Sequence, residues 1–83
     1  MKITLKLFAS LQDFLPDGAA ENAIAIEIPN HASLDLIIDR YRIPRELTHL
    51  VLVNGVYSPP TDRHQANLKE GDTVAIWPPV AGG

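Results

Sequence analysis

Hydrophobic residues recur at every second position in three stretches of the chain, residues 1–8, 23–29 and 73–77. This period of two is typical of a β-strand with one face in the core. The first two stretches are expected to pair antiparallel. The positions predicted to face the core are Ile3, Leu5, Leu7, Ile24, Ile26, Ile28, Val74 and Ile76.

One stretch has helical spacing instead. Ser33 is a suitable N-cap for it, Asp35 in the first turn suits the positive end of the helix dipole, and Pro44 is expected to stop it. A period of 3.6 gathers its apolar side chains into one stripe, which must be buried against another element. The stripe consists of Leu34, Ile37, Ile38 and Tyr41.

The segments between these elements are shorter. Residues 9–15 favour a short helix with Ser10 as its N-cap. Residues 50–53 and 56–58 favour short strands joined at Asn54-Gly55, a strong hairpin signal. A polar connection then leads to the last strand.

The order of these elements limits the architecture. One main helix must cover one face of a mixed sheet, because this arrangement buries both apolar patterns. The length of 83 residues suits a single domain. We therefore predict an α+β domain over residues 1–77, followed by a flexible C-terminal tail over residues 78–83.

Composition and charge exclude several kinds of chemistry. The net charge of −3 offers no broad basic surface for a nucleic-acid backbone. The apolar runs are too short to span a bilayer and no secretory signal is visible, so we expect a cytoplasmic protein away from membranes. Without cysteine, the chain has no thiolate metal ligand and no thiol to carry sulfur. The spread positions of its histidines (His31, His49 and His64) also predict no metal site.

The end of the sequence combines two prolines with two glycines. Pro78 and Pro79 have no N–H, so the sheet cannot continue past Trp77, and they favour an extended path. Gly82 and Gly83 have no Cβ, so they can pass a narrow channel, and a side chain on the last residue would crowd its carbonyl carbon.

Three aromatic residues are candidates for a docking surface. Phe8 and Trp77 fall on the face of their strands opposite to the core, and Tyr57 follows the Asn-Gly turn. Aromatic side chains on an open sheet face are favoured interface anchors. If the first and last strands are neighbours in the sheet, Phe8 and Trp77 share one exposed patch, and Tyr57 is expected to join them.

In these features the chain resembles the ubiquitin-like sulfur carriers, which include the small subunit of molybdopterin synthase and the sulfur carrier of the thiamine pathway. The resemblance covers essentially the whole chain, and its tail looks closer to the molybdopterin branch. Residues 63–67 depart from the Asp-x-Pro-Leu pattern of that branch. The motifs that carry the resemblance are Lys6-Leu7-Phe8-Ala9, Val53-Asn54-Gly55, residues 68–75 and Pro78-Pro79-Val80-Ala81-Gly82-Gly83.

The resemblance implies a β-grasp fold and a carrier rather than an enzyme. An E1-like adenylating enzyme would use ATP to activate the carboxylate of Gly83, sulfur would replace AMP to give a thiocarboxylate, and a larger synthase subunit would accept the sulfur for molybdopterin. The chain itself is expected to bind no cofactor, to be monomeric when free, and to use Gly82 for access to narrow active sites. The partner-binding residues would be Phe8, Tyr57, Trp77, Pro78, Pro79, Val80 and Ala81.

Three alternatives remain open at the level of sequence. The sulfur acceptor belongs to thiamine synthesis, tRNA thiolation or another pathway; the chain is a ubiquitin-like modifier of lysines; or it is an interaction domain with an inert tail.

Overall fold

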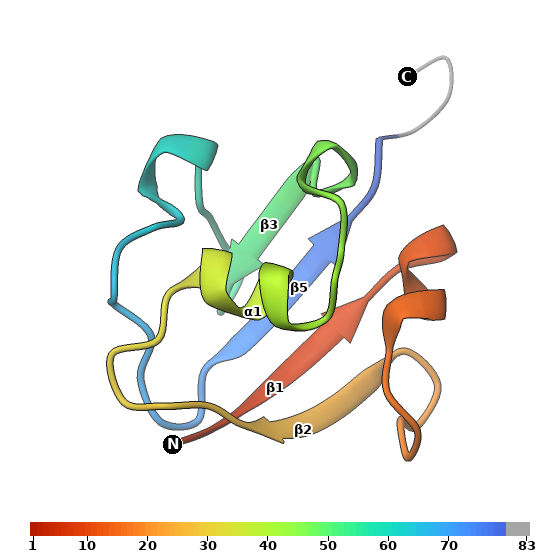
Figure 1. The fold of residues 1–83 in the computed structure, drawn as a ribbon, viewed down its shortest axis with the longest axis horizontal. Helices are drawn as coiled ribbons and strands as arrows, with labels where there is room; N and C mark the ends of the chain where they lie inside the picture. Colours follow the sequence, from red (N-terminus) through yellow and green to blue (C-terminus); the bar gives the residue numbers. More distant parts are fainter. Residues whose placement is uncertain (80–83) are drawn as a thin grey trace.

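A mixed sheet crossed by one α-helix forms the framework of the protein in a computed structural model that describes residues 1–79 (Figure 1). The strand order is β2-β1-β5-β3-β4, with β1 and β5 parallel at the centre and the other neighbours antiparallel. This arrangement confirms the predicted mixed sheet and the antiparallel pairing of the first two strands. The elements are β1 (Lys2–Leu7), β2 (Ala23–Glu27), α1 (Leu34–Arg40), β3 (Leu50–Val53), β4 (Val56–Tyr57) and β5 (Thr73–Trp77).

The hydrophobic core lies between α1 and one face of the sheet. The register places Leu5 beside both Ile24 and Val74, so the alternating apolar positions of three strands meet on one side. Full burial of each such side chain contributes roughly 1.5–3 kcal/mol. The predicted core positions are buried except for Ile24 and Tyr41, which are half-buried at the margin. The side chains with the least exposure are Ile3, Leu5, Leu7, Leu11, Ile37, Ile38, Val51, Val74 and Ile76.

The start of α1 agrees with the sequence, and its end does not. The Ser33 hydroxyl accepts a hydrogen bond from the Leu36 N–H at 3.1 Å, which confirms the N-cap. The helix ends at Arg40, however, before the chain reaches Pro44. The prediction that the proline stops the helix is therefore wrong.

A Schellman motif ends α1 instead. Arg42 takes a left-handed conformation with φ of 57°. Its N–H donates to the Asp39 carbonyl at 3.1 Å, and the N–H of buried Ile43 donates to the Ile38 carbonyl at 3.0 Å. These two bonds satisfy carbonyl groups that the last helical turn leaves free, so the helix ends without a proline.

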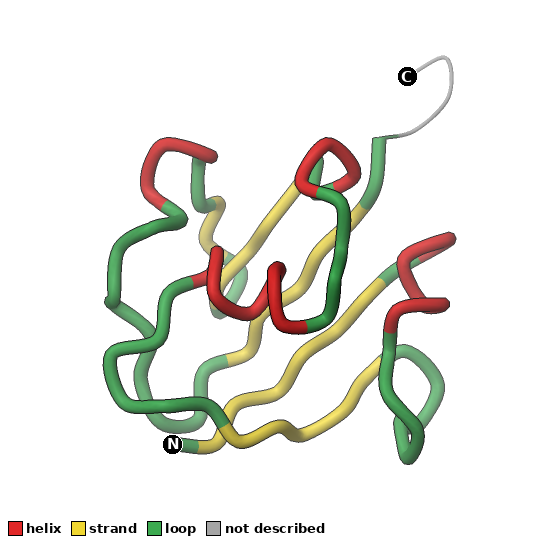
Figure 2. The backbone as a smooth tube through the Cα atoms, in the orientation of Figure 1, coloured by secondary structure: helices red, strands yellow, loops and turns green. Residues whose placement is uncertain are grey.

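The short helix after β1 is a 3₁₀-helix, η1 (Ala9–Phe14). The prediction of Ser10 as N-cap is wrong, because Ser10 lies inside the helix and Phe8 occupies the cap position without a side-chain bond. The Leu11 N–H donates to the Phe8 carbonyl at 3.0 Å, and the Leu11 side chain is fully buried. Figure 2 shows η1 and the other short helical turns, η2 (Arg45–Leu47) and η3 (Pro60–Asp62), around the sheet.

The Asn54-Gly55 hairpin is confirmed and is tied to the start of β5. Both residues have positive φ, 51° and 83°, as a two-residue turn of this kind requires. The Asn54 side chain accepts from the Thr73 N–H and donates to the Asp72 carboxylate, each at 2.9 Å. The turn of β3 and β4 is thereby fixed to the turn that precedes the last strand.

Candidate docking face and C-terminal tail

The candidate site occupies the face of the sheet that α1 leaves open. Side chains alternate between the two faces of a strand, so the residues between the core positions point to this side. The register places Ala75 of β5 between Lys6 of β1 and Leu52 of β3, and it pairs Trp77 with Leu50. We define the docking face as Phe8, Leu50, Leu52, Tyr57, Ala75 and Trp77.

Phe8 and Trp77 lie together, as the sequence predicted, and their rings are in direct contact. Their rings are stacked with centroids 4.1 Å apart and planes at 7°. The Phe8 N–H donates to the Ile76 carbonyl at 3.1 Å, which extends the β1–β5 pairing one residue beyond β1. Both side chains remain half-buried. The stacked pair therefore presents an apolar surface at the end of the last strand, and its docking role stays a prediction.

Ala9 follows the stacked pair in a strained conformation. Its φ is 52°, in the left-handed region that residues with a Cβ rarely adopt. The residue lies at the point where the chain leaves the sheet and enters η1. The strained residue is therefore next to the stacked pair. Backbone hydrogen bonds of Phe8 and Leu11, on either side of Ala9, maintain its conformation.

Leu50 and Leu52 belong to the docking face, and the sequence analysis missed them. Both are half-buried, and they lie between the aromatic pair and the hairpin. Leu52 is paired with Ala75, which is only 8% exposed although it lies on the open side. The sequence did indicate that two residues of this strand face outward, because Leu50 and Leu52 alternate with Val51 and Val53. The side chains of a strand alternate between its faces, so all four cannot point to the core.

Tyr57 lies at the far margin of the docking face. It is paired with Leu52 across β3 and β4, so it points to the open side. Strand β3 separates it from Trp77 on β5, so it joins the patch through the leucines rather than through ring contact. It is 51% exposed, which leaves its ring accessible to a partner.

The chain leaves the sheet at the end of β5. The Trp77 carbonyl accepts the His49 N–H at 3.0 Å, and the prolines that follow have no N–H to continue the ladder. Pro78 is buried in its own domain, so Pro79 is the exposed member of the pair. The other predicted tail residues, Val80, Ala81, Gly82 and Gly83, lie outside the described residues.

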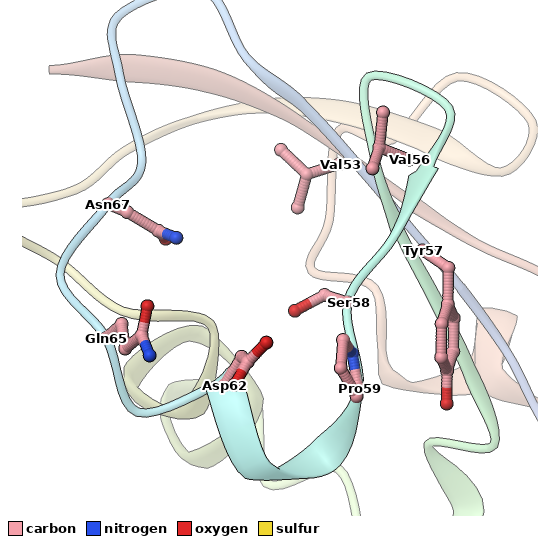
Figure 3. A pocket seen from close by; sticks show the side chains of 8 residues that line it. All are labelled: Val53, Val56, Tyr57, Ser58, Pro59, Asp62, Gln65 and Asn67. Carbon is pink, nitrogen blue, oxygen red and sulfur yellow. The ribbon is translucent and has the colours of Figure 1, made fainter.

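A pocket of about 280 Å³ lies beside β4, and Tyr57 of the docking face is one of its lining residues (Figure 3). Asp62, Gln65 and Asn67 line it from the loop that follows β4, and Val53 lines it from the core side of β3. Within residues 1–79, no three His, Asp or Glu side chains gather as metal ligands. No helix in the same range has the length and apolarity to cross a membrane.

Comparison with solved structures shows the same fold in proteins of low sequence identity. SAMP1 of Haloferax volcanii is 23% identical, with a TM-score of 0.69 and complete coverage of both chains. A putative molybdopterin converting factor subunit 1 of Pyrococcus furiosus is 24% identical, with a TM-score of 0.64 over 95% of this chain and 98% of that one.

A third neighbour was solved together with a partner. It comes from the complex of subunits 1 and 2 of the molybdopterin-converting factor of Helicobacter pylori, with 19% identity, a TM-score of 0.58 and complete coverage of both chains. These likenesses confirm the β-grasp fold that the resemblance implied. No curated protein matches the chain significantly by sequence.

The family assignment comes from the sequence itself. The model of the ThiS family matches residues 5–83, which include the docking face, the hairpin and the whole tail. The match thus covers both parts of the candidate site. The chain belongs to the ThiS family.

Proposed function

We propose that this chain is a sulfur carrier whose terminal glycine is adenylated, converted to a thiocarboxylate and delivered to a sulfur-accepting enzyme. The observation that carries the proposal is the family match, which runs through Gly83. The structure adds an apolar surface at the end of β5, next to the start of the tail. A surface that docks and an end that reacts are the two parts that a carrier needs.

The chemistry takes place at the carbonyl carbon of Gly83. A carboxylate is a poor electrophile, and reaction with ATP turns it into an acyl-adenylate with release of pyrophosphate. A sulfur nucleophile at the oxidation level of hydrosulfide then attacks this carbon. The new C–S bond forms, the C–O bond to AMP breaks, and the thiocarboxylate results. In this proposal the partner enzymes are the catalysts, and the E1-like adenylating enzyme binds the ATP.

The acceptor that we propose is the precursor of molybdopterin, bound in a larger synthase subunit. The ending Pro-Pro-Val-Ala-Gly-Gly supports this choice. The structural neighbour solved with its own subunit 2 supports a synthase partner of this kind. The docking face would bind that partner while the tail enters its active site.

A second function uses the same activated end. The name of SAMP1, one of the structural neighbours, denotes a small archaeal modifier protein. If a lysine amine rather than sulfur attacks the acyl-adenylate, an isopeptide bond to a target protein forms. Thiamine synthesis is a further acceptor pathway for a ThiS-family carrier.

A transfer assay separates these functions. The chain with a terminal thiocarboxylate, prepared by thiolysis of an intein fusion, is mixed with the larger synthase subunit and the molybdopterin precursor. We expect the product to gain sulfur while the chain returns to its carboxylate form, and the chain with an ordinary carboxylate serves as the control. The synthase subunit must first be shown to accept sulfur from its own carrier. If the chain then keeps its thiocarboxylate in the presence of that subunit, this acceptor is excluded.

A further inference from the structure

Lys6 lies beside the stacked aromatic pair on the open face of the sheet. It precedes Phe8 by two positions, and its partner Ala75 on β5 precedes Trp77 by two positions. Side chains two positions apart share a face of a strand, so Lys6 points to the same side as the aromatic pair. It is half-buried, which places its aliphatic stem against the sheet and its ammonium at the surface. A cation thus borders the docking face.

The register shows which charges on the open face offset one another. The charged side chains that the five strands place on this face are Lys2, Lys6 and Glu27. Lys2 lies directly opposite Glu27 on β2, and opposite charges in such a cross-strand pair attract. Lys6 lies between Ala23 of β2 and Ala75 of β5, whose methyl groups offer neither a charge nor a hydrogen-bond acceptor (Figure 1).

Lys6 also has no counter-charge elsewhere in the described chain. The ion pairs within residues 1–79 join Arg45 to Asp35 and Asp39, and none of them includes Lys6. The whole chain is acidic, with a net charge of −3. The uncompensated positive charge beside the aromatic pair is therefore opposite in sign to the protein as a whole, and it favours a partner surface that is negative at this point.

A partner that covers the aromatic pair also takes water away from Lys6. The two positions between Lys6 and Phe8 span less than the width of one side chain on the partner, so both residues would lie under the same surface. Burial of an unpaired ammonium is unfavourable, whereas a carboxylate in contact with it compensates for the lost water. The neighbouring residues of the face are aromatic and aliphatic, which suits a protein surface with a single acidic residue.

We propose that the protein docked on this face places an aspartate or glutamate side chain against the Lys6 ammonium, surrounded by apolar residues that cover Phe8 and Trp77. The inference rests on the proposed function, which supplies the larger synthase subunit as the docked protein. The ion pair contributes selectivity, because a similar apolar surface without the carboxylate would bury an unpaired charge.

The test is a calorimetric titration of the larger synthase subunit with the unmodified chain and with Lys6→Met. Methionine keeps an aliphatic stem and removes the charge, so we expect binding about tenfold weaker, the loss typical of one charge-assisted hydrogen bond. Unchanged binding would contradict the ion pair. Tighter binding would show that the partner covers Lys6 with an apolar surface, and it would also overturn the proposal.

Lys2→Met is the matched control. It makes the same change of charge on the same face of the same strand, at an exposed position opposite Glu27. We expect it to bind the larger subunit as the unmodified chain does. Equal losses in Lys2→Met and Lys6→Met would show that only net charge matters and would contradict a specific contact at Lys6.

A carbodiimide provides a second measurement, because it joins an amine to a carboxylate only where the two are in contact. In the complex of the unmodified chain we expect an amide bond between Lys6 and an aspartate or glutamate of the larger subunit, located by mass spectrometry of the digested complex. The Lys2→Met complex should give the same cross-link. A complex that forms normally but yields no cross-link at Lys6 would refute the inference.

The same experiments distinguish this inference from the function on which it rests. If the unmodified chain does not bind a subunit that binds its own carrier, the proposed function and the inference both fail. If the unmodified chain binds and Lys6→Met binds equally well, the ion pair alone is excluded and the proposed function stands.

Discussion

At the residue scale, the stacked pair of Phe8 and Trp77 carries the candidate site. Alternation in the sequence places both residues on the open face, and the parallel pairing of β1 with β5 brings them together. The sequence could therefore predict this contact once the two strands were taken as neighbours. It could not predict the burial of Arg63, because the partners of that side chain, Thr48 before β3 and Ser58 after β4, lie in irregular segments on either side of the hairpin.

The first prediction concerns Trp77. Trp77→Ala should weaken binding to the larger synthase subunit by about 2 kcal/mol or more, the loss typical of a buried aromatic anchor. Val56→Ala is the matched control, because Val56 is 70% exposed and lies on the other side of the sheet. Calorimetric titration measures both affinities. Equal affinities for Trp77→Ala and the unmodified chain would remove Trp77 from the docking face.

The second prediction concerns the strain at Ala9. Ala9→Gly should stabilise the fold by about 0.5–1 kcal/mol, because glycine adopts a positive φ without the clash of a Cβ. Ala20→Gly is the control, since Ala20 does not have a positive φ and the change should lower stability instead. Urea unfolding reports both free energies. A loss of stability in Ala9→Gly would show that the alanine methyl group does more for packing than its conformation costs.

At the element scale, the elements predicted with repeating patterns agree with the structure, and the ends of elements agree less well. The strands and α1 follow from period and spacing. The end of α1 does not, because the helix ends in a Schellman motif with Arg42 in a left-handed conformation, before the chain reaches Pro44. Arginine has no preference for that conformation, so the sequence does not indicate this end. The open face of β3 was missed because its inward and outward positions are both aliphatic, so the pattern does not distinguish the sides.

The third prediction concerns the clamp between the hairpin and β5. Asn54→Gly keeps the positive φ and removes the two side-chain bonds to Asp72 and Thr73, so it should cost roughly 1–3 kcal/mol of unfolding free energy. A double-mutant cycle with Asp72→Ala measures the coupling by urea unfolding. Additive losses, with no coupling between the two positions, would show that their hydrogen bond contributes no net stability.

At the scale of the whole molecule, one central strand connects the fold to the function. β5 lies between β1 and β3, contributes Val74 and Ile76 to the core and Trp77 to the docking face, and continues directly into the tail. The direction in which the tail starts is therefore fixed by the most buried part of the sheet. The proposed reactive carboxylate lies six residues beyond the end of β5.

The fourth prediction separates folding from function. Deletion of Gly83 leaves every residue of the hydrophobic core unchanged, so the unfolding midpoint in urea should not change. The shortened chain should still bind the larger subunit through the docking face but should receive no sulfur, since the activated carboxylate is then misplaced by one residue. Thiocarboxylate formation on the shortened chain at the normal rate would contradict the role assigned to Gly83.

The most direct test of the central proposal is the mass of the intact protein after incubation with ATP, a sulfide source and its cognate adenylating enzyme. We predict that one oxygen at the C-terminus is replaced by sulfur, that the change depends on ATP, and that fragmentation places it at Gly83. An unchanged mass beside an adenylating enzyme that is active on another carrier, or the appearance of lysine conjugates alone, would contradict the account.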